Sequence, residues 1–219
     1  MSDDVEETVE TSVGTAGLAL DVPPSPGALL IIGHGAGGGV NARDILAVGK
    51  AAVAAGYAVA RTTQPYRLAG RTAPAPARQL DAAFTELVAA LRKRRRLRGV
   101  PVITGGRSSG ARVACRTAGA VGADGVLCLA FPLHPPGRPD KSRADELLGV
   151  QVPVLVVQGE RDTFGPPGEV LATGPGPHVE LYRVPGADHG MSVRRGDPPV
   201  LGDVAARVVE WVGGITGRS

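Results

Sequence analysis

The segment Gly106-Arg107-Ser108-Ser109-Gly110 places a serine between two glycines in the pattern G-x-S-x-G. The apolar, β-branched stretch Val100-Pro101-Val102-Ile103-Thr104 precedes it and predicts a buried strand, and residues 111–116 continue it with a helical pattern. A G-x-S-x-G between a strand and a helix is the sharp turn that presents a nucleophilic serine. We therefore predict acyl-transfer chemistry, with Ser108 as the nucleophile in a strained turn for which the glycines leave room.

A serine hydroxyl needs a neutral imidazole as its base, and that imidazole needs a carboxylate to fix its tautomer. Asp162 and His189 follow Ser108 along the chain, and each comes just after a predicted strand. The carboxyl ends of parallel strands meet at one edge of a sheet, so we expect Ser108, Asp162 and His189 to form a catalytic triad. Glu160 is a rival for the acid, and Asp188 is a weaker rival because it is adjacent to His189.

A glycine-rich turn, Gly33-His34-Gly35-Ala36-Gly37-Gly38-Gly39, follows the first core strand directly. In this position an H-G-x-G turn supplies one backbone N–H to an oxyanion hole, and the residue after the nucleophile supplies the second. The expected donors are the backbone N–H groups of Ala36 and Ser109.

The same turn also matches a dinucleotide-binding pattern, because Gly33, Gly35 and Gly38 satisfy G-x-G-x-x-G. That pattern expects an acidic residue at the end of the next strand, where this chain has Arg61. A nucleotide site would also leave the serine, aspartate and histidine without a role. We therefore rank it well below a hydrolase.

Further residues are candidates for substrate binding, namely His34, Arg107, His134 and Phe164. Arg107 precedes the nucleophile and would suit a substrate carboxylate, with a structural salt bridge as an equally good alternative. His134 lies in a proline-rich loop where it would line the mouth of the site, although a fully hydrogen-bonded loop histidine is the favoured interpretation. The four histidines and two cysteines show no metal-ligand spacing, so we predict no metal and no cofactor.

The elements that must position these residues alternate along the chain from residue 28. The predicted strands are 28–32, 57–62, 101–105, 125–130, 153–158 and 178–184, and the predicted helices are 42–55, 76–98, 109–119, 142–148, 167–173 and 199–212. Weaker patterns at 8–13 and 18–22 suggest edge strands, and we expect residues 1–12 to be flexible or an edge strand. The alternation predicts an α/β fold with a mostly parallel sheet flanked by helices. A chain of 219 residues fits a single such domain, 1–219, without a lid.

A basic run at residues 92–98 suggests either an anionic partner or the end of an amphipathic helix. The helix end is favoured, because cations oppose the dipole at a helix C-terminus and Gly99 is placed to stop the helix. Aromatic residues make up only 3% of the chain, which leaves little for base stacking. We expect a small-molecule partner and no nucleic acid.

The two cysteines, Cys115 and Cys128, fall on predicted core elements, which favours a reducing compartment. The N-terminal residues are acidic, unlike the start of a signal peptide. No apolar stretch approaches the ~20 residues that span a bilayer. We therefore expect a cytoplasmic protein without a membrane partner.

Several stretches together resemble the small, lidless α/β-hydrolase-like family that includes testis-expressed protein 30 and the hydrolase-like subunit of the non-specific-lethal complex. They are His34-Gly35-Ala36-Gly37-Gly38, Gln64-Pro65-Tyr66 with Gly70-Arg71, Gly105-Gly106-Arg107-Ser108-Ser109-Gly110, Phe131-Pro132-Leu133-His134-Pro135-Pro136-Gly137, Gln158-Gly159-Glu160-Arg161-Asp162-Thr163-Phe164-Gly165 and Asp188-His189. The resemblance implies an α/β-hydrolase fold with Ser108, Asp162 and His189 as its triad. The family is akin to dienelactone hydrolases, which carry cysteine at the elbow, so their substrate does not transfer to a chain with serine there.

Together these observations predict a carboxylesterase-type serine hydrolase, from a bacterium by its Ala/Arg/Gly-rich composition, that cleaves a small ester, thioester or related acyl bond. In this hypothesis Ser108 attacks, His189 shuttles the proton and Asp162 orients His189. Without a lid, short soluble acyl groups are the expected substrates. The alternative is a catalytically idle interaction module. Some members of the family that the chain resembles act as scaffolds, and a fold alone does not establish catalysis.

Overall fold

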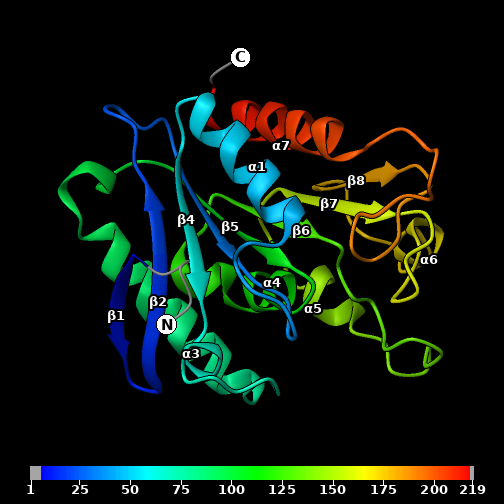
Figure 1. The fold of residues 1–219 in the computed structure, drawn as a ribbon, viewed down its shortest axis with the longest axis horizontal. Coiled ribbons are helices and arrows are strands. Elements are labelled where there is room, and N and C mark those ends of the chain that lie inside the picture. The colour runs from blue at the N-terminus through cyan, green and yellow to red at the C-terminus, as the bar shows by residue number, and fades with distance from the viewer. Residues whose placement is uncertain (1–5, 218–219) are drawn as a thin grey trace.

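The structure, a computed structural model, describes residues 6–217 and is built around an eight-stranded sheet (Figure 1). The strand order is β1-β2-β4-β3-β5-β6-β7-β8. The strands are β1 (Glu7–Thr11), β2 (Gly14–Asp21), β3 (Leu29–Gly33), β4 (Ala58–Thr63), β5 (Val102–Arg107), β6 (Gly125–Leu129), β7 (Val154–Gly159) and β8 (Val179–Val184). β2 pairs antiparallel with both β1 and β4, whereas β4, β3, β5, β6, β7 and β8 run parallel.

Helices cover both faces of the sheet, with α1 and α7 on one face and α3 to α6 on the other (Figure 1). The helices are α1 (Arg43–Ala54), α2 (Pro65–Leu68), α3 (Ala77–Arg92), α4 (Ser109–Val121), α5 (Ala144–Leu148), α6 (Pro167–Ala172) and α7 (Leu201–Thr216), with a 3₁₀ turn at Arg95–Leu97. None of the helices between residues 6 and 217 is both long enough and apolar enough to cross a bilayer.

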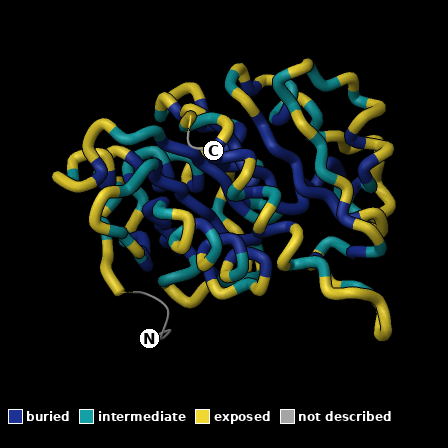
Figure 2. The backbone as a smooth tube through the Cα atoms, turned by 90° about the horizontal axis from the view of Figure 1, so that it is seen from above, coloured by how far each residue is buried: buried dark blue, intermediate teal, exposed yellow. Residues whose placement is uncertain are grey.

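The central strands are continuous apolar runs because both of their faces are covered. In β3, Leu30 and Ile32 face α1 and α7, whereas Leu29 and Ile31 face α3, and all of them are fully buried. Figure 2 shows the buried backbone running through the middle of the molecule, with exposed segments at the periphery. Because β4, β3, β5, β6, β7 and β8 run parallel, their carboxyl ends lie along one edge of the sheet. The loops that carry the candidate site residues follow these strand ends.

The predicted fold class is confirmed, and the six core strands begin and end within two residues of their predicted positions. The weaker N-terminal prediction is only partly right, because β2 starts at Gly14 and lies between β1 and β4 rather than at the edge. A short strand with alternating polar and apolar residues does not specify which strand it will pair with. The position of β2 in the sheet therefore could not be predicted from the sequence. The one-turn helix α2 was not predicted. Residues 1–5 of the segment 1–12 lie outside the described residues.

The helix predicted at 76–98 ends at Arg92, so Gly99 does not stop it. The reason is Leu97, which is 1% exposed and packs into the apolar cluster beneath α3, drawing the chain away from the helical path. Side chains of the basic run then bond to nearby groups: Arg92 donates to the Gly122 carbonyl, and Arg94 lies 2.7 Å from a Glu7 carboxylate oxygen. Part of the run therefore caps and pairs within the molecule.

The connection from β5 to α4 brings two backbones into contact. A Cβ added at Gly106 would overlap the backbone of Gly110, and a Cβ added at Gly110 would lie 2.5 Å from the carbonyl oxygen of Gly33. Real Cβ atoms do not approach backbone atoms this closely, so these positions need glycine. The start of α4 can thus lie directly against β3 and β5.

Substituting alanine at two glycines of α4 should have opposite effects. Gly110→Ala should lower the free energy of unfolding by about 1–3 kcal/mol, because the new methyl group overlaps the Gly33 carbonyl. Gly119→Ala, in the same helix with nothing within 4 Å of the added Cβ, should raise it by up to about 1 kcal/mol through helix propensity. Denaturant unfolding of both variants measures this, and equal effects would contradict the packing argument.

Candidate active site

Ser108 occupies the turn between β5 and α4 in a strained backbone conformation. Its φ is 52° and its ψ is −111°, and its backbone N–H donates to the carbonyl of Leu129 at the end of β6, over 2.9 Å. Positive φ is uncommon for a residue with a side chain and marks a position that its surroundings hold in place. Within residues 6–217 the other two non-glycine residues with positive φ, Ala130 and Met191, also lie in loops at this edge.

Ser108, His189 and Asp162 form a continuous line of hydrogen-bonding groups. Ser108 Oγ lies 2.9 Å from His189 Nε2, and His189 Nδ1 lies 2.8 Å from Asp162 Oδ2 and 3.0 Å from Oδ1. Asp162 is 2% exposed, whereas Ser108 and His189 are half-buried and reachable from solvent. A carboxylate that accepts from Nδ1 leaves Nε2 free to take the serine proton.

The two rival acids bond elsewhere. Glu160 accepts a hydrogen bond from the backbone N–H of Gly186, over 3.0 Å. Asp188 accepts from the backbone N–H groups of Gly190 and Ser192, over 2.8 and 2.9 Å, and so shapes the turn that carries the histidine. Neither carboxylate is bonded to the His189 ring, so the geometry favours Asp162.

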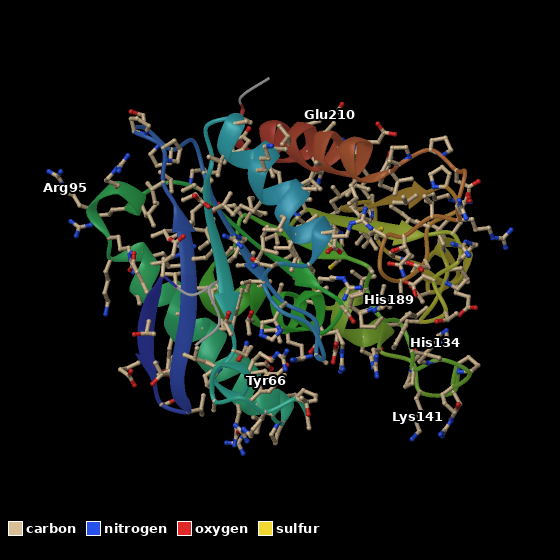
Figure 3. The ribbon with its side chains drawn as sticks, in the orientation of Figure 1. Tyr66, Arg95, His134, Lys141, His189 and Glu210 are labelled. Carbon is tan, nitrogen blue, oxygen red and sulfur yellow. The ribbon has the colours of Figure 1, made fainter. Side chains whose placement is uncertain are left out.

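Phe164, a candidate for substrate binding, instead stacks on the histidine. The two ring centroids are 4.1 Å apart with an interplanar angle of 27°. The backbone N–H of Phe164 donates to Asp162 Oδ1 over 2.8 Å. The turn after β7 thus supplies both the acid and the wall against which the imidazole rests, and Figure 3 shows where His189 lies.

The glycine-rich loop after β3 is braced from α2. The Tyr66 hydroxyl, labelled in Figure 3, donates to the Ala36 carbonyl over 2.8 Å. Arg67 Nε donates to the Gly38 carbonyl over 3.1 Å. Ala36 is half-buried, and Ser109 is the first residue of α4, where a backbone N–H has no partner within its own helix. The hydrogen bonds from Tyr66 and Arg67 thus hold the glycine-rich loop in place. This loop contains Ala36, whose backbone N–H is one of the predicted oxyanion donors.

His34, another candidate for substrate binding, is 3% exposed and bonded on both ring nitrogens. Its Nδ1 donates to the Gly35 carbonyl over 2.7 Å, and its Nε2 accepts from the backbone N–H of Gln64 over 3.1 Å. Burial lowers the pKa of His34, which keeps the ring neutral and able to accept. The structure therefore places His34 inside the loop as a structural link to α2.

Arg107 lies in an ion pair rather than standing free. Its Nε is 3.1 Å from Oδ2 of Asp44, a residue of α1 that is 1% exposed, and its Nη2 donates to the His189 carbonyl over 3.1 Å. Burial raises the pKa of Asp44 in spite of the nearby guanidinium. The alternative of a structural salt bridge thus describes Arg107 better than a free carboxylate-binding group.

The glycine-rich loop departs from a dinucleotide site in two respects. The helix α1 begins at Arg43, several residues after Gly38, whereas the fingerprint glycines open directly into their helix. Arg61, which would have to bind a 2′-phosphate, donates to Asn41 over 2.7 Å. Among residues 6–217 no three histidine, cysteine, aspartate or glutamate side chains lie close enough to hold a metal ion.

His134 is buried beside the site and contacts two acceptors. Its Nδ1 lies 2.8 Å from the Pro135 carbonyl, and its Nε2 lies 2.7 Å from Glu169 of α6. The hydrogen bond to Pro135 and the Glu169 carboxylate together raise the pKa of His134. Its backbone N–H donates to the Phe164 carbonyl, so His134 holds the loop after β6 against the acid turn (Figure 3).

Two residues of this region were not assigned a role from the sequence. Asp44 stands in the first turn of α1 with no spacing that relates it to Arg107, so only the folded structure reveals the pair. Gln158 is the first residue of the segment 158–165 that carries the family resemblance. It is fully buried and donates a hydrogen bond to Asp162, and the sequence alone did not indicate this contact.

Comparisons with known proteins match this chain to one family along most of its length. A family model described as alpha/beta hydrolase domain matches residues 26–213. That range contains the glycine-rich loop, the elbow, the acid turn and the histidine loop.

Solved structures share the fold at low sequence identity. A lidless α/β serine hydrolase from Xanthomonas campestris has a TM-score of 0.71 and 22% identity, covering 96% of each chain. The Est1E protein of Butyrivibrio proteoclasticus, solved with ferulic acid, has a TM-score of 0.78 and 18% identity over 97% of this chain and 100% of its own. A dienelactone hydrolase from Anabaena variabilis has a TM-score of 0.74 and 20% identity over 95% and 96%. At these identities the likeness concerns the fold.

The His134–Glu169 contact should stabilise the protein in a pH-dependent way. A raised histidine pKa stabilises the folded state below the ordinary value of 6.5, and this contribution is lost as the pH rises through the raised pKa. Glu169→Gln should therefore lower the melting temperature at about pH 6 and have little effect at about pH 9.

Glu210→Gln is the control for this experiment, because Glu210 pairs with Arg207, which stays charged throughout. Its effect on the melting temperature should be the same at both pH values. A Glu169→Gln effect that is equally independent of pH would show that His134 does not titrate through this contact.

Proposed function

The chain belongs to the family of the alpha/beta hydrolase domain, and from this we propose that it is a serine hydrolase of the carboxylesterase type. The observation that carries the proposal is the line from Ser108 through His189 to Asp162, with heavy-atom distances of 2.9 and 2.8 Å. Such a line activates a hydroxyl that is otherwise a weak nucleophile.

In the proposed reaction His189 Nε2 removes the proton from Ser108 Oγ as the oxygen attacks the acyl carbon. Asp162 holds the Nδ1–H tautomer and stabilises the imidazolium that forms. The imidazolium then gives its proton to the leaving alcohol, and water hydrolyses the acyl-enzyme by the same steps. Phe164, stacked on the ring at 4.1 Å, limits the rotation of His189 while it carries the proton.

The negative oxygen of the tetrahedral intermediate needs donors that are already in position. We assign the backbone N–H groups of Ala36 and Ser109 to this role. Tyr66 supports the assignment by bonding to the Ala36 carbonyl, and the N-terminus of α4 favours negative charge beside Ser109. One such donor is typically worth about 3–4 kcal/mol of transition-state stabilisation.

The proposed substrate is a small, soluble ester, thioester or related acyl compound. The segment between β6 and α5, residues 130–143, is too short to form a lid domain over the site. Apolar side chains nearby are turned into the core: Phe131 is 0%, Leu133 4% and Met191 3% exposed. Little apolar wall therefore remains to hold a long acyl chain.

A finer kinship, with testis-expressed protein 30 and the hydrolase-like subunit of the non-specific-lethal complex, is also a proposal. It rests on the elbow and on Leu133-His134-Pro135-Pro136-Gly137. The alternative is a catalytically idle scaffold, as in some members of that family. A scaffold would not require Ser108, His189 and Asp162 to be aligned, so we favour catalysis. A reducing, cytoplasmic location is likewise a proposal, supported by the free thiols of Cys115 and Cys128.

An activated nucleophile should react covalently with a fluorophosphonate. Wild-type protein should be labelled, and Ser108→Ala should not. Ser109→Ala is the matched control, because it removes the neighbouring hydroxyl but keeps the backbone N–H and should still be labelled. Mass spectrometry of the adduct locates the serine. Equal labelling of wild type and Ser108→Ala would remove Ser108 from this role, and an unreactive wild type would favour the scaffold.

A site with no lid domain and little apolar wall should favour short acyl groups. Acetyl and butyryl p-nitrophenyl esters should have kcat/KM values about tenfold or more above that of palmitoyl, a difference of about 1.4 kcal/mol. The measurement is kcat/KM across the series below the micellar limits. A steady rise towards long chains would refute the argument and would imply an apolar channel.

A further inference from the structure

Gln158 is a fully buried polar residue at the end of β7, four residues before Asp162. It is 0% exposed, and its Nε2 lies 2.9 Å from Asp162 Oδ2, 2.7 Å from the Gly165 carbonyl and 3.1 Å from the Phe131 carbonyl. The surrounding strand residues are apolar, so this amide is an exception within the core.

The orientation of the Gln158 amide follows from its neighbours. All three groups near Nε2 are acceptors, namely a carboxylate and two carbonyls, and only an N–H can face them. The reversed amide would place its oxygen against three other oxygens. The side chain is therefore a donor to Asp162, and its two hydrogens serve three acceptors.

This arrangement has an energetic cost. The Oε1 atom of Gln158 is buried without a hydrogen-bond partner among the described residues. A buried, unpartnered carbonyl oxygen destabilises a fold, and an apolar side chain of the same length would avoid the penalty. Apolar packing alone therefore does not account for an amide here; its hydrogen bonds to the Asp162 carboxylate and to the Gly165 and Phe131 carbonyls do.

The bonds of Asp162 show what the amide contributes. His189 Nδ1 lies within 3.0 Å of both carboxylate oxygens, Phe164 N–H donates to Oδ1, and Gln158 Nε2 donates to Oδ2. Each oxygen thus has one donor in addition to the imidazole. The two donors hold the carboxylate plane at both oxygens, and loss of Gln158 would leave Oδ2 bonded to the imidazole alone.

We propose that Gln158 is a positioning residue for the acid of the triad, an inference that rests on the proposed function. Its amide locks the Asp162 carboxylate towards His189 and ties it to Phe131 and Gly165. Those carbonyls belong to the loop after β6 and to the turn that carries Phe164, so one side chain joins the acid to two segments bordering the site. Gln158 acts through Asp162, and within residues 6–217 it makes no hydrogen bond to Ser108 or to the His189 ring.

The test removes the donor while keeping the volume. Gln158→Met retains the length of the side chain but cannot donate. Val156→Ala is the matched control, because Val156 is buried on the same strand and the same face, and its truncation destabilises the core without touching Asp162. Melting temperatures of both variants show how much stability each has lost.

Turnover of an acetyl ester supplies the first readout. Gln158→Met should lower kcat by about 10- to 100-fold, the factor for losing a hydrogen bond to a charged group, with KM changed less than about twofold. Val156→Ala should keep kcat within about twofold even where its melting temperature falls further. A Gln158→Met kcat equal to that of Val156→Ala would overturn the proposal.

A second variant covers a failure of Gln158→Met to fold. Gln158→Glu keeps the shape and donates through its carboxyl proton, but its burial beside Asp162 disfavours a second negative charge. Its kcat should fall as the pH rises and that proton is lost, whereas wild-type kcat should not. A Gln158→Glu profile that runs parallel to wild type at a kcat as low as that of Gln158→Met would contradict the proposal.

Nuclear magnetic resonance separates this inference from the proposed function. The ring proton between His189 Nδ1 and Asp162 should give a downfield resonance in wild type and Val156→Ala, and it should be lost or broadened in Gln158→Met. This signal does not require turnover. An unreactive wild type whose resonance depends on Gln158 would reject the serine hydrolase but keep the positioning role. A reactive wild type whose resonance survives Gln158→Met would reject the positioning role alone.

Discussion

The contact between two backbones at the start of α4 is the constraint on which the rest of the site depends. With no Cβ at Gly106 or Gly110, the helix lies directly against the ends of β3 and β5. The turn that joins them is then so tight that Ser108 takes a φ of 52°. Its hydroxyl lies 2.9 Å from His189 Nε2, and α4 begins at the next residue, Ser109.

Buried polar contacts hold the other loops to this fixed point. The glycine-rich loop is bonded to α2 through His34, Tyr66 and Arg67. The histidine loop is bonded to Arg107, which is itself paired with Asp44 of α1. These bonds are partly buried, so water competes with them less than at the surface, and they place two loops from different strands around one serine.

Much of the fold could be predicted because the central strands are buried on both faces and therefore read as unbroken apolar runs. Ser108 and Asp162 follow such buried strands and His189 follows the partly exposed β8, and this order also placed the candidate triad at one sheet edge. The rest depended on contacts between distant segments. The pairing of β2 with β4, the contact of Arg107 with Asp44 and the contact of Gln158 with Phe131 join residues far apart in the chain, and no local pattern encodes them.

The strand order leaves β1 and β8 as the two edges of the sheet. Edge strands present unpaired backbone groups that another chain can extend into a larger sheet, with aggregation as the result. Both edges here are polar: Glu7 and Glu10 lie on β1, and Glu180 and Arg183 are exposed on β8. Joining a second copy at either edge would bring charged side chains into a strand-to-strand interface. The arrangement that gathers the site at the strand ends therefore also leaves edges that resist such extension.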